Sequence, residues 1–416
     1  KKRGFRNMQI SNLGTFQKFW SQFSSRFGKK ESYDTKRFQQ SFSSNRRLSL
    51  RTEPGWNDGN FSTSQMRNVY SQSISSGRRS TSWSGSSDGD AIRTARGRGD
   101  ENEPNFNLDV PPNGYAWWYI DGVEPNSGQA ISIIAFIGSV FSPWYKWSGR
   151  KQPQNNVCLN VATYGKKSRF TMTDRGKSAL IQEPNKLTIG PSSLIWDRSK
   201  KELIIKVNEI SSLPLISKLK GTITLKPSGI TNVELPLTKE GTHIWRPFAP
   251  TAEIEVNLNK PEWQWTGHGY FDANFGTRAL EQDFDYWTWG RFPLGKGTSC
   301  FYDLELRNRE KYQFEYHFES NGMAKNIADA PQNSNFSNSL WGIKRKTRCD
   351  KHAKPKQEKS LLDAPFYSRA TVSTRIKGEK TVGVFEALDL RRFRNPLLMF
   401  MLAVRVPRRK LWKNKS

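Results

Sequence analysis

Alternating apolar and polar residues mark the stretch 242–276 as two neighbouring strands. Its first half has apolar residues at every second position: Ala252, Ile254, Val256 and Leu258. This period of two is typical of a half-buried β-strand. The second half carries four polar or aromatic side chains with the same period: His268, Tyr270, Asp272 and Asn274. Because side chains alternate along a strand, these four share one face, and the stretch predicts a strand pair that gathers an imidazole, a carboxylate and aromatic rings.

Short apolar runs separated by Gly, Pro, Asn and Asp recur from about residue 105 onwards. They lie at 115–120, 157–165, 169–176, 186–197, 202–210, 221–229, 285–291, 301–306, 312–318, 339–343, 369–376 and 381–387. The run 131–147 is continuously apolar, which predicts a strand buried on both faces. Many short strands predict an all-β fold, an antiparallel barrel or sandwich. Since one small barrel does not use about 300 residues, we expect two β domains, 105–250 and 251–412.

The first 104 residues differ in composition from the rest. Residues 1–100 contain 20 Ser, and 19 Lys or Arg against 7 Asp or Glu, without a helical or strand period. Such a composition cannot supply a core, so 1–104 is predicted to be a disordered basic tail. An arm that binds RNA or anionic lipid is the alternative.

The whole chain of 416 residues is strongly basic, with a formal charge of +28. A basic chain favours an acidic partner, either nucleic acid or the anionic face of a membrane. No run approaches the roughly 20 apolar residues of a membrane-crossing helix, and the start lacks the apolar core of a secretory signal. The cysteines form no CxxC pair, which predicts reduced thiols in a cytosolic setting; they are Cys158, Cys300 and Cys349.

An apolar run near the end, 397–404, is flanked by arginines on both sides. It is too short to cross a bilayer but suits a segment that lies on a membrane surface. The alternative is that its leucines and methionines pack into the β fold, and both can hold in part.

The chemistry of the chain centres on Asp272. There is no GxSxG nucleophile elbow (GSSDG at 85–89 lies in the Ser-rich tail) and no P-loop, HExxH or CxxC motif, which disfavours nucleotide and metal enzymes. A carboxyl group in an apolar pocket has a raised pKa and can donate a proton near neutral pH. Nearby Trp and Tyr rings stabilise a positive charge, and His243 is suited to orient or deprotonate a water. Alternatively, Asp272 caps the loop 273–276.

Several collinear motifs resemble the bacterial carotenoid 1,2-hydratase family, from about residue 104 to 410. They include GYAWWYIDG (114–122), HIWRPFAPTAEIEV (243–256), GHGYFDANFGTRALEQDF (267–284) and RFRNPLLMFMLAVRVPRR (392–409). The resemblance implies a two-domain lipocalin-like β-barrel fold. It also implies cofactor-free addition of water, with no metal, to the terminal C1=C2 bond of an acyclic carotene such as neurosporene or lycopene.

The resemblance also implies roles for individual residues. The family's HxW and YxD segments fall on His243 with Trp245 and on Tyr270 with Asp272. Asp272 is then the acid, His243 holds the water, and the two aromatic rings face the cation. Candidates to line the polyene site, with ordinary core packing as the alternative, are Trp117, Phe136, Phe141, Tyr145 and Trp265.

Because an acyclic carotene dissolves in membranes, the resemblance implies a peripheral enzyme on the cytoplasmic side of the inner or photosynthetic membrane. We expect no nucleic-acid partner. Three other functions remain open from the sequence: a silent lipocalin-like carrier of an apolar ligand, a related two-domain cyclase, and a nucleic-acid-binding protein that uses the basic arm.

Overall fold

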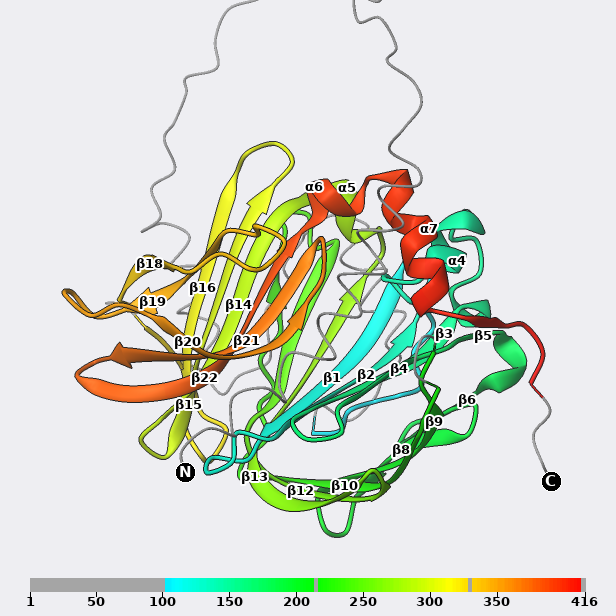
Figure 1. The fold of residues 1–416 in the computed structure, drawn as a ribbon, viewed down its shortest axis with the longest axis horizontal. Coiled ribbons are helices and arrows are strands. Elements are labelled where there is room, and N and C mark those ends of the chain that lie inside the picture. Colours follow the sequence, from blue (N-terminus) through cyan, green and yellow to red (C-terminus); the bar gives the residue numbers. More distant parts are fainter. Residues whose placement is uncertain (1–101, 213–215, 328–330, 413–416) are drawn as a thin grey trace, which may run out of the picture. The chain divides into compact units, whose positions relative to one another are not determined.

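A computed structural model describes residues 102–212, 216–327 and 331–412. Strands dominate these residues and the helices among them are short (Figure 1). Apart from one short parallel pair, the strands pair antiparallel. The all-β, antiparallel fold class predicted from the sequence is therefore confirmed. The predicted basic tail, apart from 102–104, lies outside the described residues.

The larger of the sheets found in the described residues has fourteen strands. Its order is β23 (Arg408–Arg409), β5 (Asp174–Arg175), β3 (Val157–Tyr164), β2 (Ala130–Ile137), β1 (Tyr115–Val123), β13 (Glu262–Gly276), β12 (His243–Lys260), β10 (Lys218–Pro227), β9 (Glu202–Ile210), β8 (Ser192–Asp197), β7 (Lys186–Ile189) and β6 (Leu180–Glu183). Two further strands lie off this path: β11 (Leu235–Pro236) pairs with β12, and β4 (Arg169–Met172) pairs with β3. The parallel pair is β23 with β5.

A second sheet of seven strands follows along the chain. Its order is β17 (Ala324–Asn326), β16 (Lys311–Phe318), β15 (Gly297–Leu306), β14 (Phe284–Leu294), β22 (Glu379–Asp389), β21 (Tyr367–Ile376) and β20 (Lys356–Asp363). A two-stranded sheet joins β18 (Gln332–Phe336) to β19 (Arg345–Cys349). Within the described residues, the α-helices are α4 (Pro143–Trp147), α5 (Leu280–Asp283), α6 (Leu390–Phe393) and α7 (Pro396–Arg405), and single 3₁₀ turns occur at Pro153–Asn155 and Lys177–Ala179.

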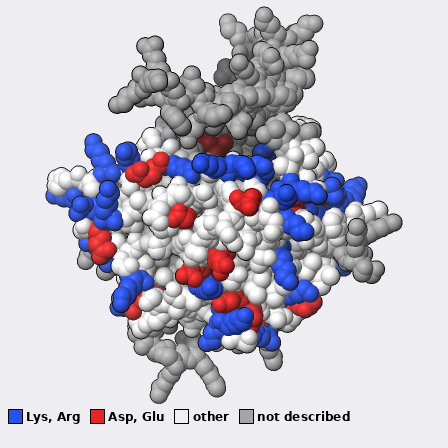
Figure 2. Space-filling model, turned by 60° about the horizontal axis from the view of Figure 1, so that its bottom comes forward, with Lys and Arg blue, Asp and Glu red and all other residues white. Residues whose placement is uncertain are grey.

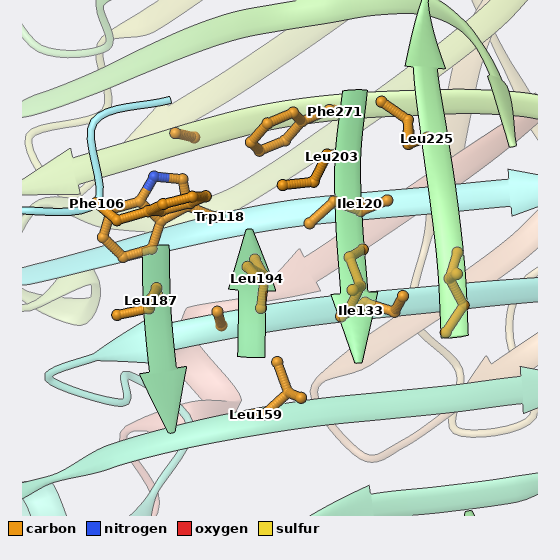
Figure 3. Close-up of a cluster of buried hydrophobic side chains, with 14 of the residues drawn as sticks. Phe106, Trp118, Ile120, Ile133, Leu159, Leu187, Leu194, Leu203, Leu225 and Phe271 are labelled. Carbon is orange, nitrogen blue, oxygen red and sulfur yellow. The ribbon is translucent and has the colours of Figure 1, made fainter. Parts of the chain in front are cut away.

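Two apolar clusters lie on opposite faces of the larger sheet. The first lies inside the curl of that sheet, between strands such as β1–β3 and β7–β10, and it is purely apolar. In Figure 3 these two groups of strands cross steeply, with side chains such as Ile120, Leu159 and Leu203 between them. The second cluster joins the outer face of β1, β2, β12 and β13 to the seven-stranded sheet and to α6 and α7. We call them the inner cluster and the aromatic cluster.

Strands β12 and β13 contribute to both clusters because their side chains alternate. In β13, Phe271, Ala273 and Phe275 face the inner cluster, whereas Tyr270 belongs to the aromatic cluster. The predicted alternation from Ala252 to Leu258 is confirmed, since buried and exposed residues follow each other without a break. The shared strand pair therefore couples the two clusters directly.

Two strand predictions are wrong in part. The run 131–147 is a strand only to Ile137, because Gly138 takes a left-handed conformation (φ +67°) and Pro143 opens helix α4. Ser339–Ile343 is a turn rather than a strand. There the Ser339 carbonyl accepts from the Gly342 amide at 2.9 Å, with Gly342 at φ +69°.

The expected domain boundary at 250/251 falls inside β12. The chain passes from the larger to the seven-stranded sheet later, between β13 and β14. Sequence periodicity does not reveal this, because β12 continues through the bulges between Arg246 and Ala252. The division into two domains stays a prediction.

Three further features bear on possible partners: the surface charge, the cysteines and the length of the helices. On the face shown in Figure 2, Lys and Arg side chains are spread widely, with Asp and Glu among them. The cysteines Cys158, Cys300 and Cys349 are buried and unpaired. In the part of the chain that is described, the helices are all too short or too polar to cross a membrane.

Candidate active site

Four adjacent strands present one continuous face to the seven-stranded sheet. In the register of β12, β13 and β1, Trp245 pairs with Asn274 and Asn274 with Trp117. Two residues along β13, Asp272 pairs with Tyr119 of β1. Since the side chains at positions two apart point the same way, this face carries the predicted group from His243 to Asp272. The register thus confirms the shared face expected for the even-numbered residues of β13.

Asp272 lies at the centre of this face and is 4% exposed. Its Oδ2 accepts hydrogen bonds from Trp245 Nε1 at 2.9 Å and from the Tyr270 hydroxyl at 2.8 Å. Its Oδ1 is buried and has no hydrogen-bond partner among the described residues. Burial raises the pKa of Asp272 to about 8, although the two hydrogen bonds oppose the shift. The carboxyl group is therefore protonated at neutral pH, and Oδ1 is the oxygen left to carry the proton.

Aromatic rings surround this carboxyl group on several sides. Trp245 packs edge-on against Tyr302, with ring centroids 5.5 Å apart, and Tyr270 lies 5.2 Å from Trp289. The guanidinium of Arg291 stands 5.6 Å from the centroid of the Tyr270 ring. Such rings offer electron-rich faces to a positive charge. The apolar walls also explain why desolvation dominates the pKa of the acid.

The charge of Arg291 is balanced by a second buried carboxylate, Asp121. Arg291 Nε donates to Asp121 Oδ1 at 2.7 Å, and the Tyr119 hydroxyl donates to Oδ2 at 2.6 Å. A buried ion pair of this kind needs such additional hydrogen bonds to offset its desolvation. The Arg291–Asp121 ion pair therefore fixes the positive charge of Arg291 next to the Tyr270 ring.

His243 is completely buried, and both of its ring nitrogens are engaged. Nε2 lies 2.8 Å from Asp283 Oδ2, and Nδ1 lies 2.8 Å from the Tyr115 hydroxyl. Burial raises the pKa of Asp283, but the hydrogen bonds from His243 and Thr242 and the nearby charge of Arg278 together outweigh it and leave the pKa below its ordinary value. An ionised Asp283 only accepts, so Nε2 carries the hydrogen and Nδ1 accepts from Tyr115.

The imidazole of His243 is neutral in this arrangement. Burial lowers its pKa, and Asp283 offsets the shift only in part. A neutral imidazole backed by a carboxylate is the arrangement that lets histidine take up a proton. Because Nδ1 accepts from the Tyr115 hydroxyl, that hydroxyl stands between the imidazole and any water to be deprotonated. Burial raises the pKa of Tyr115, so the hydroxyl keeps its proton.

The acid and the imidazole lie on neighbouring strands, β13 and β12, and are separated along the strand direction. His243 pairs with Gly276, four positions from Asp272, or about 13 Å of strand. Trp245 and Asn274 lie between them. A substrate that uses both groups therefore lies over Trp245.

Three of the five predicted lining residues, Trp117, Phe136 and Phe141, belong to or pack against the aromatic cluster around the acid. Trp117 stacks on Tyr115 at 4.8 Å and contacts Phe136, which in turn contacts Phe141. Tyr145 is buried in α4, and its hydroxyl donates to the Gly114 carbonyl at 2.6 Å. These contacts are equally those of a packed core, so the lining role stays a prediction.

Trp265 does not join the other predicted site residues. It packs against the inner cluster, on the face of β13 opposite to Tyr270. The reason is its odd position in a strand whose even positions face the acid. His268 lies on the face of β13 that carries Tyr270, at the exposed end of the strand and away from the acid. Its carbonyl accepts a hydrogen bond from Arg291 at 3.4 Å.

Three site residues were missed by reasoning from the sequence: Tyr115, Asp283 and Arg291. Tyr115 and Asp283 lie within the motifs 114–122 and 267–284, but their partnership with His243 joins residues 128 and 40 positions apart. The strand register brings Tyr115 to His243, and helix α5 after β13 brings Asp283. Among the residues that the structure describes, no group of His, Cys, Asp or Glu is arranged to hold a metal ion.

Comparison with known proteins gives a consistent result for most of the chain. The family model described as "Carotenoid hydratase CrtC" matches residues 133–415. A protein named acyclic carotenoid 1,2-hydratase from Cereibacter sphaeroides is 59% identical over 280 residues, which cover 67% of this chain and 99% of that protein. Its namesake from Rhodobacter capsulatus is 55% identical over 284 residues, 68% of this chain and 100% of that protein.

Similarity to solved structures is weaker. NE1406 from Nitrosomonas europaea is 11% identical and has a TM-score of 0.47, with 66% of this chain and 92% of that chain covered.

Proposed function

Because this chain belongs to the carotenoid hydratase CrtC family, we propose that it adds water across the terminal C1=C2 bond of an acyclic carotene by acid catalysis, as a hydro-lyase. The relatives at 55–59% identity support an enzyme with an acyclic carotenoid substrate. The observation that carries the mechanism is Asp272, buried and protonated, with Oδ1 unoccupied by any described donor. The product is a tertiary 1-hydroxy end group.

The first step transfers the proton of Asp272 to C2. The electron pair of the double bond forms the new C2–H bond, which leaves a tertiary carbocation at C1 and a carboxylate on Asp272. Trp245 and Tyr270 then donate hydrogen bonds to a charged oxygen rather than a neutral one, and charge-assisted bonds are stronger. Their rings also face the cation, each worth roughly 0.5–2 kcal/mol, or about one to three factors of ten in rate for both.

The second step is attack of water on C1. As its oxygen bonds to C1, the water passes a proton to the Tyr115 oxygen while Tyr115 passes its own to Nδ1 of His243. Asp283 stabilises the imidazolium that results. This extends the expectation that His243 holds the water directly, because both of its nitrogens already have protein partners. The proton gained by His243 and the one lost by Asp272 balance through solvent.

Polar side chains near Tyr115 support this route for the water. Asn113, Arg150 and Glu281 line a small hollow beside Tyr115, together with the apolar side chains of Val140 and Leu280. The carotene is then proposed to approach from the opposite side, along Trp117, Phe136 and Phe141. Because the substrate dissolves in membranes, we place the enzyme peripherally on the cytoplasmic face of the photosynthetic membrane.

The test is expression in a lycopene-producing bacterium, followed by chromatography and mass analysis of the pigments. The wild-type chain is expected to add the mass of one water for each hydrated end. Asp272→Asn keeps the shape and hydrogen-bond acceptor of the neutral acid but lacks its proton, so turnover should fall by about 10²–10⁴-fold or more. Asp109→Asn, at an exposed position, is the matched control and should hydrate normally.

Near-normal hydration by Asp272→Asn would show that the acid is another group. A chain that binds pigment without any gain in mass would indicate the carrier function instead.

A further inference from the structure

Helix α7 is apolar on all sides although it lies at the surface. Nine of its ten residues, PLLMFMLAVR, are apolar, the exception being Arg405. Leu398 and Met399 are buried in the aromatic cluster. The other face is open, with Leu397 and Phe400 each 63% exposed and Val404 54% exposed. A surface helix ordinarily turns polar residues outward, so this face is suited to a partner that covers apolar groups.

Helix α4 extends the same apolar surface. Trp147 is 45% exposed, and its ring lies 5.4 Å from that of Phe400. Trp144 Nε1 donates to the Val406 carbonyl at 2.6 Å, which fixes α4 to the end of α7. The two helices lie side by side (Figure 1). We call Trp147, Leu397, Phe400 and Val404 the α4–α7 patch.

The chain segments that carry the α4–α7 patch are rich in cations. Residues 390–412 contain seven Lys or Arg and no Asp or Glu, and α4 is followed by Arg150 and Lys151. Some of these cations have acidic partners, since Arg391 and Arg392 lie 3.4 Å from Asp389. Even so, the guanidinium-bearing side chains of Arg391 and Arg392 are 50% and 41% exposed. Exposed cations at the rim of an apolar patch match the headgroups of an anionic lipid surface.

Contacts between aromatic rings connect this region to the acid. Phe393 of α6, next to α7, lies 6.0 Å from Phe141, and Phe141 lies 6.0 Å from Phe136. Phe136 contacts Trp117, whose backbone pairs with Asn274 beside Asp272. A series of contacting aromatic rings therefore runs from α6, next to α7, to the neighbourhood of the site.

We propose that the α4–α7 patch inserts into one leaflet of an anionic phospholipid bilayer and is the surface through which the enzyme meets its membrane-dissolved substrate. This rests on the proposed function for the identity of the substrate, but not for the binding itself. Ten helical residues span about 15 Å, half of a hydrocarbon core, so α7 lies in the interface plane. Nucleic acid would be bound by the cations alone and would leave the apolar residues uncovered.

The experiment measures flotation of the full-length chain with two kinds of vesicle, phosphatidylcholine alone and phosphatidylcholine with phosphatidylglycerol. The wild-type chain is expected to float with the anionic vesicles and less with the neutral ones. Phe400→Ser removes a large apolar side chain from the patch and should reduce the bound fraction roughly tenfold. Met323→Ser is the matched control, since Met323 is 53% exposed and lies between β16 and β17, at the end of the seven-stranded sheet opposite to α6.

Equal flotation of both variants and the wild-type chain would overturn the proposal. So would a dimer in the absence of vesicles that Phe400→Ser dissociates, because the patch would then join two copies of the chain. Hydration of lycopene in detergent micelles is measured in parallel, and Phe400→Ser should retain it. Loss of hydration by the wild-type chain in micelles would contradict the proposed function and leave the result on docking intact.

Discussion

At the scale of single residues, the site depends on the state of one carboxyl group. Asp272 is held neutral by burial, yet it keeps two hydrogen bonds that strengthen when it ionises. This combination suits an acid that must hold its proton against water and give it to a carbon–carbon double bond. The hydrogen bonds from Trp245 and Tyr270 are stronger to the carboxylate than to the neutral acid, so they favour the state after proton transfer.

The raised pKa of Asp272 predicts how stability changes with pH. The folded pKa of about 8 lies above the ordinary value of 3.8. The folded state therefore binds more protons than the unfolded state between these values, so the free energy of unfolding falls as the pH rises towards 8. Between pH 6 and pH 9, the free energy of unfolding should fall by roughly 2–3 kcal/mol more for the wild-type chain than for Asp272→Asn.

Urea unfolding at the two pH values measures this difference, with Asp109→Asn as the control that behaves like the wild-type chain. Parallel pH profiles for wild type and Asp272→Asn would mean that the carboxyl group is already ionised at pH 6.

Much of this residue-level description was predictable, because Asp272, Tyr270 and Trp245 stand out in sequence by their residue types and spacing. The partners of His243 were not predictable. Tyr115 reaches it from β1 and Asp283 from α5, and nothing in the local sequence of either records that contact.

At the scale of elements, the pairing of β1, β13 and β12 brings three residues to one point. Gly276 pairs with Tyr115 on one side and with His243 on the other. A glycine is needed there for space. A Cβ at this position would overlap the Tyr115 ring and lie 2.8 Å from His243 Nδ1.

Gly276→Ala is therefore expected to lower hydration by about 10²-fold, since misplacement of a reacting group by about 1 Å has effects of that size. Pigment analysis in the lycopene-producing host measures it, with circular dichroism as a check on folding. Gly295→Ala is the control: its Cβ would meet nothing within 4 Å, although φ is +57°. It should cost some stability and no activity. Normal hydration by Gly276→Ala would argue against the role of the Tyr115–His243 pair.

Alternation along β12 and β13 was visible in the sequence, but the end of a strand often was not. The run 131–147 is uniformly apolar, so its change from strand to helix leaves no trace in hydropathy and depends on Gly138 and Pro143. Ser339–Ile343 has the composition of a strand, whereas Leu340 and Trp341 are 70% and 39% exposed in a turn. Both errors arise because a run of apolar residues looks the same in sequence whether it lies in a strand, in a helix or in an exposed turn.

At the scale of the whole molecule, the site lies in the interface between the two larger sheets rather than at their rim. The sequence predicted an all-β fold, but the order of strands could not be predicted, because β1 pairs with β13 across about 150 residues and such long-range pairing has no local signature.

Residues 1–101 are predicted to be dispensable for catalysis. Relatives at 55–59% identity align over nearly their full length with about two thirds of this chain. The residues just after this segment already contact the folded core: Arg246 donates to the Glu103 carbonyl at 3.0 Å, and Trp118 donates to the Pro104 carbonyl at 3.2 Å. A chain that starts at residue 102 should hydrate lycopene at the rate of the full chain. Loss of activity with retained folding would give the first hundred residues a catalytic role.

The alternation of β12 and β13 between two clusters has a consequence for heat resistance. Where these strands lie between the two clusters, at 243–249 and 270–275, the side chains of one face hold the inner cluster and those of the other hold the acid and its partners, so neither set can loosen while the other stays in place. Catalysis and secondary structure should therefore be lost in one cooperative thermal transition. Substitutions that improve packing around Ile120 and Leu203, without touching any reacting group, would prolong the working life of the enzyme at elevated temperature.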